Sequence, residues 1–371
     1  MRIKTLLLAG VASGVVAAAG AASAAEVTPG GALDIKLSGQ FRTGVVFGEN
    51  DSISGRDPGY GFYTNNRFFI DVRGKDDGSL MEYGGRVRLR LDNGRGNFTS
   101  RTQQIIVGNE PITVATGETS SGPIIDRSWL FVRGGWGEIR FGNEVGPGDE
   151  MKVFSSTVAA GTGGVDGDFN PAFNDSPFTY TVPLSGAATK IVYYTPTLAG
   201  FQAGVSFAPD DDAGGLISQI DDTGGGRQHV EGGISYKGGF SGVDLLASVT
   251  ASTAKRVEGT NDDADINGIM GGISVGFGGF NVAGAYGTNG GDVEDVDYWN
   301  VGIGGAFGPA KLSLEYATAE GADQEPTAIV ASATMGLMPG LSLLADVGLY
   351  DSDAEDSDES FAGLVAIDIQ F

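Results

Sequence analysis

The segment at residues 80–91 reads L-M-E-Y-G-G-R-V-R-L-R-L, and its side chains alternate in character with a period of two. The even positions hold Glu82, Arg86, Arg88 and Arg90, whereas the odd positions hold only apolar residues or glycine. Successive side chains of a β-strand point to opposite faces, whereas a helix would distribute these arginines around its circumference. The segment therefore predicts a β-strand with one polar face toward water and one apolar face.

Most of the chain repeats this design. Alternating segments occur at 32–47, 62–75 and 361–371, and two more lie within 127–143, where 127–134 carries apolar residues on both faces. From residue 190 onward the segments come in pairs joined by short turns: 190–195 with 201–208, 228–236 with 243–251, 266–277 with 280–287, 297–307 with 311–319, and 327–335 with 341–350. The total is about sixteen strands, separated alternately by short turns and by longer, acidic loops.

This alternation of long and short connections is what an up-and-down meander requires. Strands of roughly nine to eleven residues are long enough to cross a bilayer at a tilt, and aromatic residues gather at the strand ends, as in the girdles of membrane barrels. We therefore predict an all-β fold, a single closed antiparallel transmembrane β-barrel. The alternative is a secreted β-sandwich, which would have to bury the same oily faces between two sheets and to protect several edges.

The first 25 residues indicate export. Arg2 and Lys4 precede an apolar stretch that ends in small residues suited to signal peptidase, so residues 1–25 are predicted to be a signal peptide and 26–371 the barrel. Without Arg2 and Lys4, the remaining 21 Lys and Arg against 47 Asp and Glu give a net charge of −26. Such an excess of negative charge argues against nucleic acid as a partner. The chain has no cysteine, so disulfides and thiol chemistry are excluded.

Two stretches resemble the general bacterial porins of the outer membrane, in particular alphaproteobacterial ones. Residues 127–143, R-S-W-L-F-V-R-G-G-W-G-E-I-R-F-G-N, are similar to a strand–turn–strand segment of that family, and 190–207, K-I-V-Y-Y-T-P-T-L-A-G-F-Q-A-G-V-S-F, look like its next hairpin. The terminal Phe371 resembles the chain end that the outer-membrane assembly machinery reads.

The resemblance implies a sixteen-stranded homotrimeric barrel that lets small hydrophilic solutes and ions cross the outer membrane. It further implies that a loop at residues 144–183 folds into the lumen and constricts it. The loop at 92–126 would reach a neighbouring subunit; it is unusually long, which suggests either a larger latch or an extra strand pair around 103–107 and 112–115.

The candidate site is the narrow part of the lumen. A basic wall is predicted from the polar faces of the early strands: Arg42, Arg86, Arg88, Arg90 and Arg140. The candidate constriction loop supplies the opposing carboxylates: Asp149, Glu150, Asp166, Asp168 and Asp175. Fixed cations facing fixed anions across a waterway would orient dipolar solutes and exclude apolar ones. The alternative is that these arginines only solvate the wall or pair with nearby carboxylates.

No arrangement of residues indicates an enzyme, because the single histidine, His229, lacks a convincing nucleophile partner. No cofactor or metal is predicted, although the acidic loops could bind Ca²⁺ weakly or contact lipopolysaccharide and lipid. The sequence therefore predicts a passive diffusion channel, with a solute-specific channel and a secreted structural or adhesion protein as alternatives.

Overall fold

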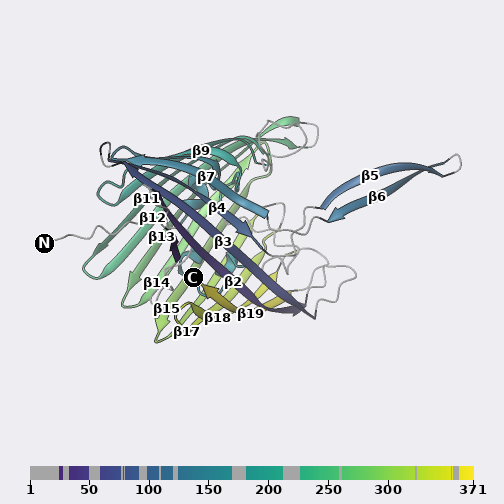
Figure 1. Cartoon of the computed structure of the whole chain (residues 1–371). Helices are drawn as coiled ribbons and strands as arrows, with labels where there is room; N and C mark the ends of the chain where they lie inside the picture. Colours follow the sequence, from purple (N-terminus) through teal and green to yellow (C-terminus); the bar gives the residue numbers. More distant parts are fainter. Residues whose placement is uncertain are drawn as a thin grey trace.

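The alternating segments form one antiparallel sheet that closes on itself in the computed structural model of the chain (Figure 1). The first barrel strand, β2 (Leu33–Glu49), pairs with β3 (Tyr60–Asp76) on one side and with the last strand, β19 (Ser360–Gln370), on the other. The structure describes residues 25–27, 33–49, 59–76, 78, 80–91, 98–107, 110–119, 124–168, 181–211, 226–258, 261–321, 324–351, 353 and 359–371.

Sixteen strands make the ring, which confirms the predicted barrel and meander. Between β3 and β19 the ring consists of β4 (Met81–Arg90), β7 (Ile124–Gly134), β8 (Gly137–Asn143), β9 (Thr189–Tyr194), β10 (Phe201–Asp210), β11 (Gly226–Phe240), β12 (Val243–Glu258), β13 (Asn261–Phe277), β14 (Phe280–Gly291), β15 (Val296–Phe307), β16 (Ala310–Glu320), β17 (Thr327–Met338) and β18 (Leu341–Asp351). A short strand, β1 (Ala25–Val27), pairs with β2 just beyond the end of β19.

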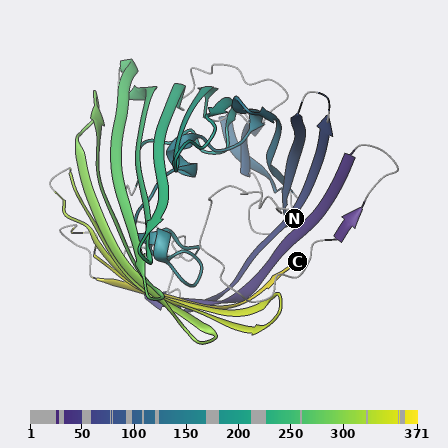
Figure 2. The ribbon, with the colours of Figure 1, turned by 90° about the vertical axis from the view of Figure 1, so that its left-hand side faces the viewer.

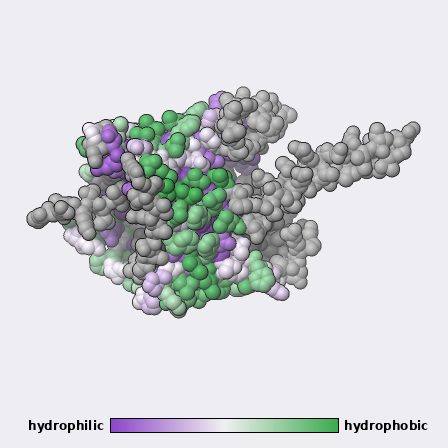
Figure 3. Space-filling view, viewed as in Figure 1, coloured by the Kyte–Doolittle hydropathy of each residue, from purple (hydrophilic) through white to green (hydrophobic). Residues whose placement is uncertain are grey.

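Apolar side chains cover the outside of the ring. Leu130, Phe141 and Ile234, for example, are all more than half exposed. Figure 3 shows the hydrophobic residues as a band across the middle of the barrel. A barrel whose outer face is apolar satisfies its backbone hydrogen bonds internally and can sit in hydrocarbon. The sandwich alternative is wrong, because the oily faces point away from the ring rather than toward each other. Among the described residues, no helix is long and apolar enough to span a membrane.

The structure shows which side chains of β7, the strand with apolar residues on both faces, point inward. Leu130 and Val132 point outward, whereas Phe131 is buried and Trp129 lies beneath the Arg140 guanidinium, 4.8 Å from the ring centroid. The inner wall here therefore contains aromatic rings that make cation–π contacts with guanidinium groups, and such contacts are favourable.

The long segment between β4 and β7 contains a hairpin of its own, which confirms the extra strand pair. Strands β5 (Phe98–Val107) and β6 (Glu110–Thr119) form a separate two-stranded sheet, drawn apart from the barrel in Figure 1. Strand β7 begins before Asp126, so this residue belongs to the barrel and not to the preceding loop. Similarly, the connection predicted at 144–183 continues to residue 188, because β9 begins at Thr189. Residues 1–24, most of the predicted leader, lie outside the described residues.

The chain end seals the seam between β19 and β2. The Phe371 amide donates to the Gly39 carbonyl at 3.2 Å, and the Gly39 amide donates to the Phe371 carbonyl at 2.9 Å. The Phe371 ring covers Gly39, where an added Cβ would lie 2.5 Å from the ring. The centroid of the Phe371 ring is 5.4 Å from the centroid of the Phe41 ring. An aromatic ring over a strand glycine restores packing that the glycine lacks.

Deletion of Phe371 is expected to slow barrel assembly much more than it lowers the melting temperature of the folded barrel. The deletion removes the terminal aromatic residue and its two backbone hydrogen bonds, whereas the rest of the β2–β19 ladder stays. The rate at which the heat-resistant folded form appears in vesicles measures assembly. Phe277→Ala, which removes an exposed aromatic ring of β13 away from the seam, is the control. Assembly at the wild-type rate would contradict the prediction.

Candidate functional site: a loop on the inner wall of the barrel

The described parts of the connection between β8 and β9, residues 144–168 and 181–188, lie against the inner wall and are called the inner loop. Its first leg, 144–168, contains α1 (Pro147–Glu150), η1 (Ser155–Val158) and η2 (Gly164–Asp166). Its second leg, 181–188, returns to β9. In Figure 2 the short helices of the first leg lie inside the ring of strands.

Arg140 of β8 holds the beginning of the first leg. Its guanidinium contacts Glu150 at 2.6 Å and the wall residue Glu138 at 2.5 Å. The same guanidinium is 4.8 Å from the ring centroids of Trp129 and of Tyr194, and the Tyr194 hydroxyl donates to Glu150 at 2.8 Å. A guanidinium that two carboxylates and two aromatic rings surround is held in one orientation.

Polar side chains on later strands bind the backbone of the first leg. Asn300 of β15 accepts from the Ser155 amide at 2.7 Å, and Ser313 of β16 accepts from the Ala160 amide at 2.8 Å. Thr334 of β17 accepts from the Gly161 amide at 2.9 Å. The loop segment is not part of a sheet, so these side chains satisfy backbone donors that would otherwise be buried without partners.

Two buried carboxylates hold residues 156–165 of the first leg, which are called the tip of the loop. Glu315 accepts from the Ser156 hydroxyl at 2.8 Å and from the Val165 amide at 3.3 Å. Asp346 accepts from the amide and the hydroxyl of Thr162, at 3.0 and 2.9 Å.

These carboxylates approach the backbone at Gly161 and Gly164, which have φ of +60° and +65°. An added Cβ would lie 2.0 Å from Asp346 Oδ1 at the first glycine and 1.7 Å from Glu315 Oε1 at the second. Glycine is therefore required at both positions, for its conformation and for space.

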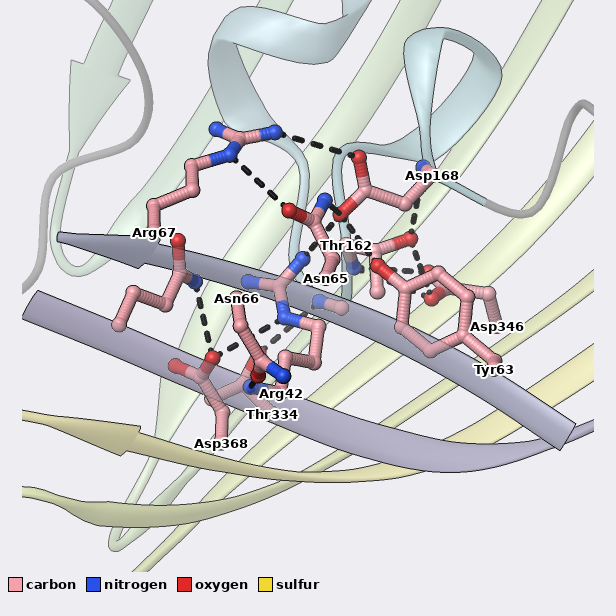
Figure 4. A network of polar contacts seen from close by, with 12 residues as sticks. Arg42, Tyr63, Asn65, Asn66, Arg67, Thr162, Asp168, Thr334, Asp346 and Asp368 are labelled. Carbon is pink, nitrogen blue, oxygen red and sulfur yellow. Dashed lines mark hydrogen bonds and ion pairs between the residues drawn. The ribbon is translucent and has the colours of Figure 1, made fainter. Parts of the chain in front are cut away.

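The far end of the first leg reaches β2 and β3 through Asp168 (Figure 4). Arg42 contacts Asp168 at 2.5 Å and also contacts Asp368 of β19 at 3.0 Å. The Tyr63 hydroxyl and the Asn65 amide donate to Asp168 at 2.6 and 2.8 Å. One loop carboxylate is thus bound from β2 and β3, at the seam where the barrel closes.

The other arginines of the predicted basic wall pair within the wall. Arg86 donates to Asp71, its direct neighbour on β3, at 2.7 and 3.1 Å. Arg88 donates to Asp126 at 2.7 and 2.5 Å, and the Arg90 Nε lies 3.7 Å from the same carboxylate. The charges on the wall are therefore largely compensated there, as the alternative interpretation of the sequence expected for some of them.

Two of the predicted loop carboxylates pair with a cation of their own loop. Lys152 contacts Asp149 at 2.8 Å and Asp166 at 3.4 Å, and its ammonium lies over the Phe154 ring. Burial alone would lower the pKa of Lys152, but the carboxylates of Asp166 and Asp149 outweigh it and raise that pKa. Burial alone would likewise raise the pKa of Asp149, and the Lys152 ammonium reverses the shift. Both groups are therefore charged at neutral pH.

The structure brings four predicted site residues into direct contact, Arg42 with Asp168 and Arg140 with Glu150. Asp175 lies outside the described residues. Sequence reasoning missed Lys152 and the wall carboxylates that bind the loop or the arginines: Asp71, Asp126, Glu231, Glu315, Asp346 and Asp368. Asp71 could have been found from the sequence, because alternation places it on the same polar face of its strand as Arg67 and Arg73. Within the described parts of the chain, no group of three His, Asp or Glu side chains could hold a metal ion.

A closed barrel with an apolar outside, and with a charged inside crossed by a loop, defines a β-barrel channel of an outer membrane. A family model described as Gram-negative porin matches residues 10–355. The chain therefore belongs to the Gram-negative porin family, and it is an outer-membrane protein with a channel role.

Similar proteins occur in Rickettsia. An uncharacterised protein of Rickettsia bellii is 23% identical over 332 residues, covering 69% of this chain and 76% of that protein. One of Rickettsia felis is 24% identical over 328 residues, covering 67% of this chain and 74% of that protein.

Solved structures share the fold at low sequence identity. An anion-selective porin from Comamonas acidovorans superimposes with a TM-score of 0.65 at 18% identity, covering 91% of this chain and all of that chain. The trimer form of OmpT, an outer membrane protein of Vibrio cholerae, gives 0.61 at 15% identity, with 92% of this chain and all of that chain covered.

Proposed function

We propose that the protein is a passive, water-filled diffusion channel for small hydrophilic solutes and ions, in which the inner loop narrows the lumen. The supporting observation is the path of the first leg. It is bound to β15, β16, β17 and β18 in turn and then to β2 and β3, so it follows the wall across the inside of the barrel. The open passage is then bounded by this loop and by the arginine-bearing strands β2–β4, β7 and β8.

The accessible charges support a polar rather than an apolar solute. Among the wall arginines named above, Arg86 has the most exposed side chain, at 37%, and on the loop the side chain of Asp166 is 52% exposed. A solute that passes between a fixed cation and a fixed anion can exchange water for matching charge if it is polar, and an apolar solute cannot. We therefore propose small polar and zwitterionic molecules, along with inorganic ions, as the solutes.

We further propose a homotrimer, with the β5–β6 hairpin as the segment that contacts a neighbouring subunit. The family supports an outer-membrane assembly of this kind, and the Vibrio cholerae OmpT structure is described as a trimer. A hairpin with its own two-stranded ladder is longer than a simple connection between β4 and β7 needs. Contacts with lipopolysaccharide and with the assembly machinery are proposed for the outer rim and for Phe371.

Catalysis is not part of the proposed function. His229, the single histidine of the chain, is only 2% exposed on β11, and its Nε2 lies 3.4 Å from Asp211. A solute in the lumen therefore does not reach the imidazole, which a general base would have to offer to its substrate.

Single-channel recording in planar bilayers tests the proposal. The purified protein is expected to give large current steps whose size rises in proportion to voltage and to salt concentration, because ions move through water. A solute-specific channel would instead show currents that a particular solute blocks at low concentration. Absence of current from correctly folded protein would overturn the proposal.

A further inference from the structure

Glu231 of β11 joins the two legs of the inner loop. One carboxylate oxygen accepts from the Gly148 amide of the first leg at 3.1 Å. The other accepts from the Ser185 amide of the second leg at 3.0 Å, and also from the Ser185 hydroxyl. We propose that Glu231 is a positioning residue that holds both legs against β11 and thereby keeps the width of the passage constant. This inference depends on the proposed function as a channel.

The surroundings of Glu231 support a role in binding the loop. The residue is 1% exposed. Its hydrogen bonds to the inner loop come from Gly148 and Ser185, and the Lys190 ammonium of β9 attracts its charge. A buried carboxylate is costly unless such donors surround it. Removal of the side chain would leave the Gly148 and Ser185 amides without their acceptor, and unsatisfied buried donors favour a displaced loop.

The loop sequence is shaped to receive this carboxylate. An added Cβ at Gly146 would lie 2.3 Å from Glu231 Oε2, and one at Gly148 would lie 2.8 Å from the same oxygen. Pro147 between them begins α1, at a position where proline is favoured because no helical hydrogen bond is lost. The run Gly146-Pro147-Gly148 therefore starts a helical turn and leaves room for the carboxylate at the same time.

A second buried wall residue also binds the second leg. Lys190 of β9 is 1% exposed, and its ammonium donates to the Gly186 carbonyl at 2.6 Å. Arg140, Glu315 and Asp346, by contrast, bind the first leg, and no contact between them and the described residues 181–188 of the second leg is seen. Glu231 is therefore the wall carboxylate through which the described residues of both legs are bound, and its loss should release the legs relative to each other.

Single-channel recording of Glu231→Ala and Glu231→Gln tests the proposal. Glu231→Ala is expected to raise the open-channel current noise several-fold and to lower the voltage at which channels close. Glu231→Gln keeps one acceptor oxygen, so its noise should lie between wild type and Glu231→Ala. The barrel should keep its heat-resistant electrophoretic mobility, because the ladders of β11 to β10 and β12 are untouched.

The control is Ser248→Ala, which removes a buried hydroxyl of the neighbouring strand β12 that makes no hydrogen bond among the described residues. Its noise should match wild type. Should Glu231→Ala fail to fold, Ser185→Ala removes one of the three donors and should raise the noise in the same direction. Wild-type noise and closing voltage in the folded Glu231 variants would overturn the inference. Absence of wild-type current would instead overturn the proposed function.

Discussion

Alanine at Gly164 is expected to push the tip of the inner loop off the wall and to lower the single-channel conductance. The new Cβ would overlap Glu315 Oε1 at 1.7 Å, and the glycine has φ +65°, which alanine adopts at a cost of about 1–2 kcal/mol. Overlap in a packed site adds about 1–3 kcal/mol. The tip is bound to β16–β18, so a displaced tip can move only into the open passage, and the current should fall.

A matched control lies in the same loop. Gly186 has φ +56°, but an added Cβ there would meet nothing within 4 Å. Gly186→Ala therefore carries the backbone strain without the overlap, and its conductance should stay close to wild type. If the two variants conduct alike, the approach of Glu315 to the loop backbone does not determine the aperture.

Removal of Arg86 and Arg88 together should shift the ion preference toward cations. The double alanine variant deletes two positive charges and leaves the carboxylates of Asp71 and Asp126 without their bidentate partners. A unit charge about 4 Å from an ion contributes about 1 kcal/mol in water, roughly a fivefold change in local ion concentration. The reversal potential in a salt gradient should move accordingly, and more strongly at low salt, because the Debye length is longer there.

Single substitutions show how much each arginine contributes to the shift in reversal potential. Arg86→Ala should account for most of the shift, because its side chain is 37% exposed and that of Arg88 is 13% exposed. Arg86→Lys keeps the charge and should leave the reversal potential near that of wild type. An unchanged reversal potential in the double variant would mean that these arginines do not line the passage.

The barrel could be predicted from the sequence because a strand in a membrane barrel has only two environments. Alternation of polar and apolar residues records which side faces lipid, and this pattern is local. The pattern failed at β7, where Trp129 and Phe131 make the inner side apolar as well. There, the rings point inward because they cover arginines, and strand periodicity carries no record of such contacts.

The candidate site was only partly predictable. The arginine row at 86–90 was visible, but the pairing with its partners was not, since these come from the neighbouring strands β3 and β7. Asp126 illustrates the reason: Arg88 pairs with Arg127 and Leu89 with Ile125, so Asp126 is the extra residue of a β-bulge. A bulge re-aims a side chain, and here it places Asp126 beside Arg88 although simple alternation would point it outward.

The sequence by itself determined the class of fold, the even number of strands and, for strands with clear alternation, the side that meets water, because these follow from a two-residue period. Only the tertiary structure decided which carboxylate meets which cation, and that Glu231, Glu315 and Asp346 bind the inner loop. Those contacts join residues far apart in the chain, and they depend on strand register, on ring closure and on the close approach that glycine permits.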